Sequence, residues 1–366
     1  MDLSRQGGLL ESTVSRAPTA DDQLLFLSKI QRLFAEGEFT ATYKFALVIS
    51  LVEIAIEVPP LSKESELEVS IRSIATKFIE LYWKQSFEFV AGRAGTRRGV
   101  LANNLGNQAA VVTAIRKFRA AAGPGASTFT AARQQRSFPS LVSEVASVVS
   151  EQPIACLQNF GGTTDTFLYE RGRRGFILLR PGVAYCLRRF QPLIQQLARS
   201  HWVDHIKANK RNLELLGETS DLESFLFSAA RKALIDYGAL LRRLTGPTCF
   251  YCSARLTEEA DVDHFVPFTL YPRDLAHNFV LAHSSCNRSK SDSLAAYDHL
   301  ARWLERNDRW SVDIAEISRE SGLVHDEAAT RAIGNWSYQA TSEAGGVAWV
   351  KKGNYEPVGA RHLALF

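Results

Sequence analysis

The sequence has 366 residues, of which 46% are hydrophobic and 22% are charged. This length allows two or three domains that each bury a core, and the composition excludes wholesale disorder and fibrous repeats. The net charge of +4 predicts no class of partner by itself.

The first ninety residues show the periodicity of amphipathic helices. Apolar side chains recur every three or four positions in 24–34, 43–58 and 71–82. The run from Phe45 to Val58 contains Glu53 and Glu57 and is shorter than the roughly 20 residues of a membrane helix. We therefore expect a helical N-terminal domain over 1–92 and no membrane span. Residues 1–18 do not resemble a secretory signal, so a cytoplasmic location is predicted.

The middle of the chain is basic. Residues 93–211 contain 18 Lys and Arg but only 5 Asp and Glu, with a dense cluster at Arg171, Arg173 and Arg174. We expect a strand within 175–183 and a helix over 188–202. The charge suits a polyanion, so 93–219 is predicted to be a DNA-binding or scaffold region. A solvated basic surface is the alternative.

Secondary-structure signals are sharper from residue 220. A capping box of Ser220 and Glu223 predicts a helix that Gly246 ends. Two short apolar runs at 262–268 and 279–283 predict strands, and the pattern over 289–306 predicts a helix. We therefore expect a domain over 220–310 and a C-terminal cap over 311–366.

Three of the five cysteines fall close together in this domain. Cys249 and Cys252 form C-x2-C, and thirty residues later His283 and Cys286 form H-x2-C. Two intervening residues let a tight turn direct both side chains to one ion, and zinc prefers four such S and N ligands. The pattern predicts a structural zinc site. Buried thiols without a metal are the alternative.

The stretch between and after these pairs resembles a known family. It reads ADVDHFVPF over 260–268 and HNFVLAHSSCNRSKSD over 277–292. Both segments are similar, in residues and in order, to the HNH endonucleases, including zinc-knuckled restriction enzymes and the HNH domain of the CRISPR RNA-guided nuclease. Many zinc-knuckled relatives have cysteine where this chain has His283. The resemblance covers about 249–303 and implies a ββα-metal, treble-clef-like module within a mainly helical α+β protein.

The residues of this module suit phosphodiester hydrolysis. Neutral His264 can accept a proton from water near neutral pH, and the oxygen ligands of Asp263 and Asn287 suit Mg²⁺ or Mn²⁺. Lys290, predicted at the start of the last helix, could grip a phosphate there. The resemblance implies the same base and metal ligands, with Asn278 bracing the loop that holds the histidine. The alternatives are a core histidine at 264, a turn cap at Asn278 and surface decoration at Lys290.

These inferences predict a metal-dependent endonuclease that hydrolyses DNA. One site cuts one strand, so we expect either nicking or a homodimer. By analogy, the context is bacterial restriction or phage defence, with partner subunits of a defence system as an option. The alternative function is a zinc-stapled module that binds nucleic acid without cleavage. A zinc deaminase is excluded because its H-x-E and P-C-x-x-C order is missing.

Overall fold

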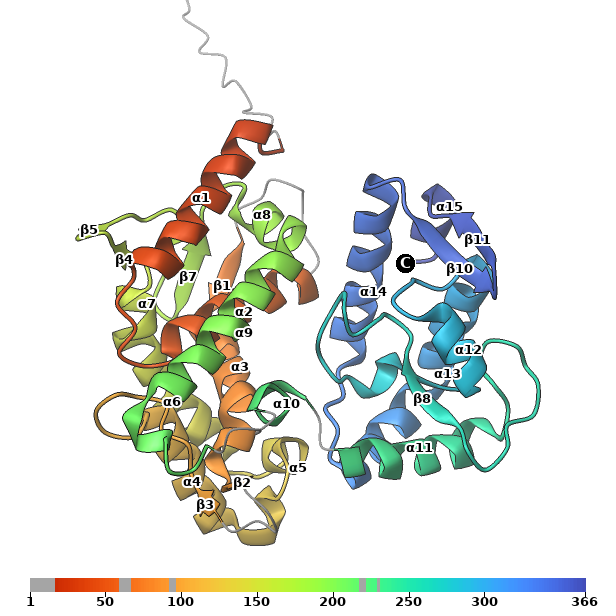
Figure 1. The fold of residues 1–366 in the computed structure, drawn as a ribbon, viewed down its shortest axis with the longest axis horizontal. Coiled ribbons are helices and arrows are strands. Elements are labelled where there is room, and N and C mark those ends of the chain that lie inside the picture. The colour runs from red at the N-terminus through yellow and green to blue at the C-terminus, as the bar shows by residue number, and fades with distance from the viewer. Residues whose placement is uncertain (1–16, 59–66, 92–96, 217–221, 229–230) are drawn as a thin grey trace, which may run out of the picture.

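The computed structural model describes residues 17–58, 67–91, 97–216, 222–228 and 231–366. These residues form a mainly helical α+β structure of two lobes that lie side by side (Figure 1). The elements of the first lobe are α1 (Ala20–Glu36), α2 (Tyr43–Glu57), β1 (Glu68–Ser70), α3 (Ile71–Trp83), β2 (Phe89–Ala91), β3 (Arg97–Gly99), α4 (Ala110–Ala122), α5 (Phe129–Arg133), α6 (Phe138–Glu151), α7 (Pro153–Cys156), β4 (Asn159–Phe160), β5 (Thr163–Thr164), β6 (Tyr169–Arg171), β7 (Phe176–Leu179), α8 (Val183–Arg189) and α9 (Gln191–Ala208).

The first lobe is built around α2, which is buried from Tyr43 to Ile56. Its mostly apolar sequence suits a central helix, because neighbours cover every face. The described residues include no helix that is long and apolar enough to cross a membrane.

The predicted N-terminal and basic segments share this lobe. Strand β1, from the first segment, pairs antiparallel with β7, from the second, in the register Val69 to Ile177. Strand β6 pairs with the other edge of β7 and completes a three-stranded sheet. The strand predicted within 175–183 is confirmed as β7, and the helix predicted over 188–202 corresponds to α9.

The second lobe contains the cysteine pairs. Its elements are α11 (Arg231–Thr245), β8 (Asp261–His264), β9 (Phe279–Ala282), α12 (Ser284–Lys290), α13 (Tyr297–Ser321), α14 (Glu327–Glu343), β10 (Val347–Lys351), β11 (Asn354–Pro357) and α15 (Ala360–Leu363), and α10 (Leu222–Phe227) precedes them between the lobes. Strands β8 and β9 pair antiparallel, with Asp263 opposite Val280.

Two helix predictions need correction. The helix expected over 289–306 is present as α13 but begins later than predicted, because α12 ends at Lys290 and α13 begins only at Tyr297. Ser291 has a positive φ of 48°, a left-handed conformation that stops the first helix. The helix expected to run from Ser220 to Gly246 is described as α10 and α11, and Ser220 itself lies outside the described residues.

The C-terminal residues pack onto the same lobe as the cysteine pairs. The backbone of Trp349 in β10 exchanges hydrogen bonds with Leu294 and Ala296, just before α13. The Trp349 indole donates a hydrogen bond of 3.1 Å to Ser289 in α12. Helix α13 continues past the predicted boundary at 310, where Trp310 departs from helical geometry.

Candidate active site and zinc cluster

The hairpin of β8 and β9, followed by α12, presents the residues of the DVDH motif. Successive side chains of a strand point to opposite faces, so Asp261 and Asp263 share one face of β8 and Val262 lies on the other. His264 is the last residue of the strand, where this alternation ends. Helix α12 packs against the face with the two aspartates, as their contacts below show. Helix α11 covers the other face, where Gly238 leaves room for Val262: a Cβ at that glycine would lie 2.6 Å from a Val262 methyl carbon.

Asp263 is buried and paired. Its carboxylate accepts a hydrogen bond from the Tyr251 hydroxyl and lies 3.2 Å from the Lys290 ammonium nitrogen. Lys290 is also buried, and burial lowers its pKa, although the Asp263 carboxylate opposes that shift. The structure therefore places Asp263 in a charge-balanced pocket between the first cysteine knuckle and α12.

Asn287 lies on the same side of the hairpin but contacts the other aspartate. Its amide nitrogen donates a hydrogen bond of 2.9 Å to Asp261, and the Ser284 hydroxyl donates one of 2.7 Å to the same carboxylate. Sequence reasoning did not single out Asp261. Its position two residues before Asp263 on a strand was the signal that could have identified it.

His264 ends β8 and contacts a carboxylate that the motif does not include. Its Nε2 lies 2.8 Å from an Asp274 carboxylate oxygen, and the ring packs against Phe268 and Phe279 at centroid distances of 5.3 and 4.5 Å. The histidine is part-buried, with 20% of its side chain exposed. It is therefore oriented on one side and accessible on the other.

Asn278 connects the end of β8 to the start of β9. Its side-chain oxygen accepts a hydrogen bond of 2.8 Å from the amide of Val266, and its side-chain nitrogen donates one of 2.9 Å to the Val266 carbonyl. Both bonds fix the backbone two residues after His264. The geometry thus matches a bracing residue more closely than a simple turn cap.

Lys290 is not where the sequence predicted it. It lies at the C-terminal end of α12, and its ammonium group donates a hydrogen bond of 2.8 Å to the backbone carbonyl of His264. The expectation of a phosphate at a helix N-terminus beside Lys290 is therefore wrong.

The C-x2-C pair and the H-x2-C pair lie close together in the structure. Cys249, Cys252, His283 and Cys286 place their ligand atoms within 4.8 Å of one another. Tetrahedral zinc, with bonds of about 2.0–2.3 Å, needs ligand atoms about 3.3–3.8 Å apart, so a small contraction would complete the site. Among the described residues, this is the one group of three or more His, Cys, Asp and Glu side chains whose ligand atoms lie close enough together to hold a metal ion.

The histidine of this cluster is held in the tautomer that a metal needs. His283 Nε2 lies 3.1 Å from the carbonyl oxygen of Arg255, so Nε2 carries the proton and donates it. Its Nδ1, which is 3.3 Å from the Cys252 sulfur, is left with a lone pair toward the cluster. The histidine at position 283 is thus oriented by a hydrogen bond to a backbone carbonyl, an interaction that a cysteine there would not need.

The thiols show why a cation suits the cluster. Burial raises the pKa of Cys249, but hydrogen bonds from the backbone amides of Cys252 and His283 outweigh it and bring that pKa down to about 7. Burial and the neighbouring Cys249 raise the pKa of Cys286 to about 12. A divalent cation would remove this mutual opposition, because it stabilises all the thiolates at once.

The first knuckle is attached to the hairpin and to α13. The Phe250 amide donates a hydrogen bond of 2.8 Å to Leu281 in β9, and Arg302 of α13 donates to the Tyr251 carbonyl and the Ser253 hydroxyl at 3.3 Å. Ser253 itself has a positive φ of 59°, as a tight knuckle requires. The cluster is therefore continuous with the strands of the active site.

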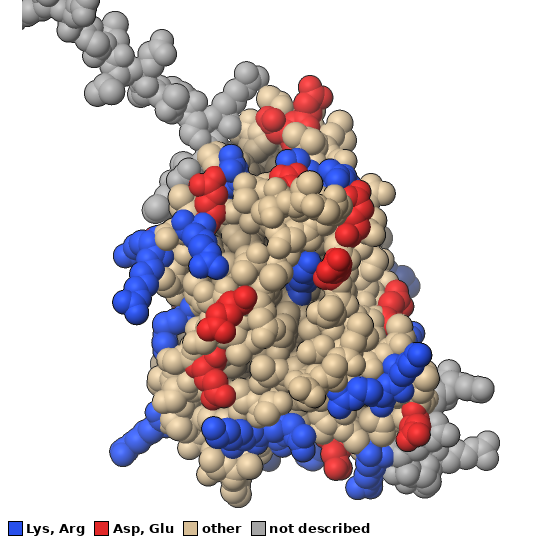
Figure 2. Space-filling view, turned by 90° about the vertical axis from the view of Figure 1, so that its left-hand side faces the viewer, with Lys and Arg blue, Asp and Glu red and all other residues tan. Residues whose placement is uncertain are grey.

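The basic cluster of the first lobe is partly neutralised. Arg173 makes two hydrogen bonds to Glu68, at 2.7 and 2.9 Å, and Arg180 pairs with Glu170. Figure 2 shows Lys and Arg side chains interspersed with Asp and Glu on one face of the molecule. Arg171 and Arg174 are exposed.

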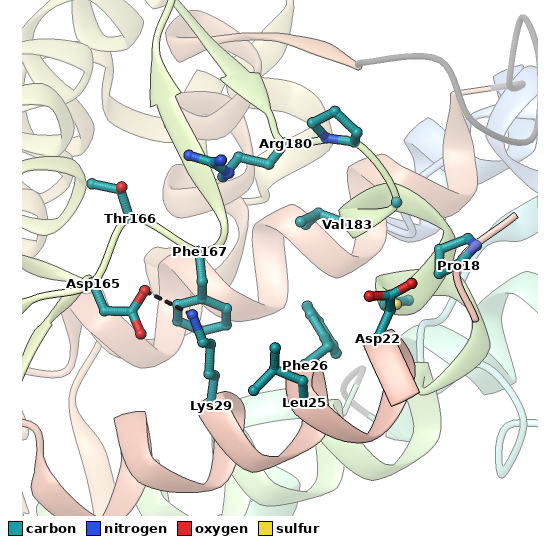
Figure 3. A pocket seen from close by; sticks show the side chains of 13 residues that line it. Pro18, Asp22, Leu25, Phe26, Lys29, Asp165, Thr166, Phe167, Arg180 and Val183 are labelled. Atoms are coloured by element: carbon teal, nitrogen blue, oxygen red, sulfur yellow. Dashed lines mark hydrogen bonds and ion pairs between the residues drawn. The ribbon is translucent and has the colours of Figure 1, made fainter. Parts of the chain in front are cut away.

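A cavity of about 650 Å³ in the first lobe contains none of the candidate residues. It lies between α1 and the segment that leads into α8, and Figure 3 shows Lys29 and Asp165 in contact with each other in its lining. These two groups form an ion pair of 3.0 Å. The charges of Lys29 and Asp165 are therefore engaged with each other. The DVDH motif lies in the other lobe.

Comparison with known families gives two matches. The model of a domain of unknown function, DUF8808, matches residues 24–221, and the model of an HNH endonuclease domain, HNH_4, matches residues 249–296. The second match contains the hairpin, α12 and the Cys3His cluster, so the resemblance found in the motif is confirmed. Comparison of the chain with curated proteins and with solved structures gave no match.

Proposed function

Because the chain belongs to the DUF8808 family and also contains an HNH endonuclease domain, we propose that it is a metal-dependent endonuclease that hydrolyses phosphodiester bonds of DNA. The observation that carries the proposal is His264, part-exposed at the end of β8 with one ring nitrogen already engaged by Asp274. No described residue hydrogen-bonds to its Nδ1. We propose that this nitrogen is the base that accepts the proton of the attacking water.

The carboxylate and amide oxygens near β8 fit a hard divalent cation. Asp263 and Asn287 are our proposed ligands for Mg²⁺ or Mn²⁺, and Asp261 is added because Asn287 contacts it. When bound, the ion would neutralise phosphate charge and stabilise the leaving oxygen. Lys290 is assigned a supporting role, holding Asp263 and the His264 backbone, and Asn278 braces the following loop.

Zinc is proposed for the Cys3His cluster, where it stabilises the fold without taking part in the reaction. Its four ligands surround a point next to the start of α12, which carries Asn287. The support is the arrangement of ligand atoms and the tautomer of His283.

We further propose that one chain cuts one strand, so a monomer nicks DNA and a homodimer would cut both strands. The motif's similarity to restriction nucleases favours a role in restriction or phage defence. Plating efficiency of phages on cells that carry wild-type protein or His264→Ala tests this role. Equal plating on both would contradict it.

Supercoiled plasmid incubated with the purified full-length protein tests the chemistry. We expect Mg²⁺ or Mn²⁺ to support relaxation to the nicked form and EDTA to stop it. His264→Ala should lower the cleavage rate about 100-fold or more, because the proton acceptor is lost. Arg331→Ala, which removes an exposed ion pair with Asp308, is the matched control. Wild-type rates from His264→Ala would overturn the proposal, and a parallel RNA substrate decides between DNA and RNA.

A further inference from the structure

The segment 271–274 connects the two lobes beside the proposed base. It follows the loop after His264, and consecutive residues in it contact the first lobe. The Tyr271 hydroxyl donates a hydrogen bond of 2.9 Å to Glu57 in α2, and Arg199 of α9 donates one of 2.7 Å to the carbonyl of Pro272. We call residues 271–274 the bridging segment.

Arg273 makes the strongest attachment. Its guanidinium donates hydrogen bonds of 3.0 Å and 2.6 Å to the two carboxylate oxygens of Glu80 in α3, and it also pairs with Glu57. Only 11% of the Arg273 side chain is exposed. Planar two-point pairing of this kind fixes direction as well as distance.

The carboxylates of this interface are balanced by buried cations. Lys77 of α3 lies 2.9 Å from Glu53 and 2.6 Å from Glu57. Arg273 from the second lobe supplies the remaining positive charge toward Glu57 and Glu80. Arg273 is therefore the cation that contacts Glu80 and a second cation on Glu57, and these contacts favour a fixed position for the bridging segment.

The next residue along the chain is Asp274, whose carboxylate lies 2.8 Å from His264 Nε2. Only 10% of the Asp274 side chain is exposed. A carboxylate acceptor at Nε2 places the ring proton there and leaves Nδ1 as the proton acceptor. The residue that orients the base is thus the immediate neighbour of the residue that anchors the two lobes.

We propose that Asp274 is a positioning residue for His264, and that the first lobe holds it in place through Arg273. This inference rests on the proposed nuclease function of His264. It gives the DUF8808 domain an indirect part in the reaction, because Glu57 and Glu80 hold Arg273 and thereby determine where Asp274 lies. Asp274 does not touch the substrate in this scheme and acts through the histidine.

Tautomer measurement tests the first half without relying on activity. The full-length protein is labelled with ¹⁵N-histidine, and the His264 ring signals are assigned by their loss in His264→Ala. We expect an Nε2-protonated ring in the wild type at neutral pH and a mixture of tautomers in Asp274→Ala. An unchanged His264 signal in Asp274→Ala would overturn the proposal.

Kinetics on plasmid DNA give the second readout. Asp274→Ala should lower kcat about 10- to 100-fold, the usual effect of removing an orienting partner, and leave KM within about twofold. Asp274→Asn keeps an oxygen acceptor and should recover part of kcat, and it decides the matter if the alanine variant does not fold. An undiminished kcat in both variants would overturn the inference, whereas wild-type cutting by His264→Ala would overturn the proposed function instead.

Glu80→Gln tests the role of the first lobe. It weakens the attachment of Arg273 from a residue in the other lobe, so kcat should fall about three- to tenfold and the His264 tautomers should begin to mix. Glu36→Ala, which removes an exposed ion pair with Arg32 in the same lobe, is the control and should change neither. Equal kcat and tautomer signals in Glu80→Gln and wild type would contradict the link between the lobes.

Discussion

The ammonium group of Lys290 donates a hydrogen bond of 2.8 Å to the backbone carbonyl of His264, so the end of α12 is tied to the residue that ends β8. The same nitrogen lies 3.2 Å from Asp263. The buried ammonium group of Lys290 therefore contacts both Asp263 and the backbone of His264. We infer from these contacts that Lys290 has a structural role.

Lys290→Met should be strongly destabilising. The substitution keeps the apolar stem but leaves the Asp263 carboxylate buried with only the Tyr251 hydroxyl as a partner. Removal of one partner of a buried pair costs about 3–5 kcal/mol of unfolding free energy. Urea unfolding of Lys290→Met and of Lys290→Met with Asp263→Asn measures this, and the double variant should recover part of the loss. A loss below about 1 kcal/mol, the value of an exposed pair, would contradict the assignment.

Zinc removal should unfold the second lobe locally. Cys249→Ser should bind less zinc than the wild type, for which we expect about one ion per chain by metal analysis. A chelator should lower the unfolding temperature of the wild type. Cys156→Ser is the matched control, because Cys156 is a cysteine outside the cluster and is exposed. Active wild-type protein without zinc would refute the site.

The buried His277 should make stability fall as the solution becomes acidic. Burial lowers its pKa to about 4, and the unfolded value is about 6.5. Between these two pH values the unfolded chain takes up a proton that the folded chain does not, so unfolding free energy is lost as pH falls from 6.5 to 4. The loss from this group is about 3 kcal/mol.

Urea unfolding at a series of pH values checks the prediction for His277. The His277→Gln variant should lose less stability between pH 6.5 and 4 than the wild type, whatever its stability at neutral pH. Parallel pH profiles of the two proteins would show that another group is responsible.

Charge reversal at Arg171 and Arg174 tests the basic surface. Both side chains are exposed on the first lobe. If they contact DNA, Arg171→Glu with Arg174→Glu should weaken binding and reduce the slope of affinity against salt, because fewer counterions are released. Arg173→Ala should have a smaller effect, since Glu68 already pairs with Arg173. Equal affinity and slope in the double variant and wild type would exclude this surface.

The sequence was most informative where chemistry requires fixed spacing. The two x2 pairs predicted the Cys3His cluster, because two ligands on one knuckle must be that close. The short apolar runs at 262–268 and 279–283 predicted the two strands β8 and β9. Helical periodicity was less reliable. It placed the start of α13 at about residue 289, because apolar spacing does not reveal the break in the helix at Ser291.

Long-range partners could not be predicted from the sequence. Asp274 lies in an irregular loop with no periodicity, and its contact with His264 is set by the way that loop turns. The pairing of Arg273 with Glu80 joins residues 193 positions apart, and no local pattern indicates it. For the same reason the acidic partners of the basic cluster became visible only in the structure.

His283 is both a proposed zinc ligand and the residue at the N-terminal boundary of α12, the seven-residue helix that carries Asn287. A helix this short does not hold itself together in water, so its first turn depends on what fixes that boundary. If zinc occupies the cluster, the order of Asn287, the proposed magnesium ligand, depends on a different metal. We therefore expect the nuclease to fall silent under zinc starvation even when magnesium is plentiful, which would make cellular zinc supply a condition for cutting.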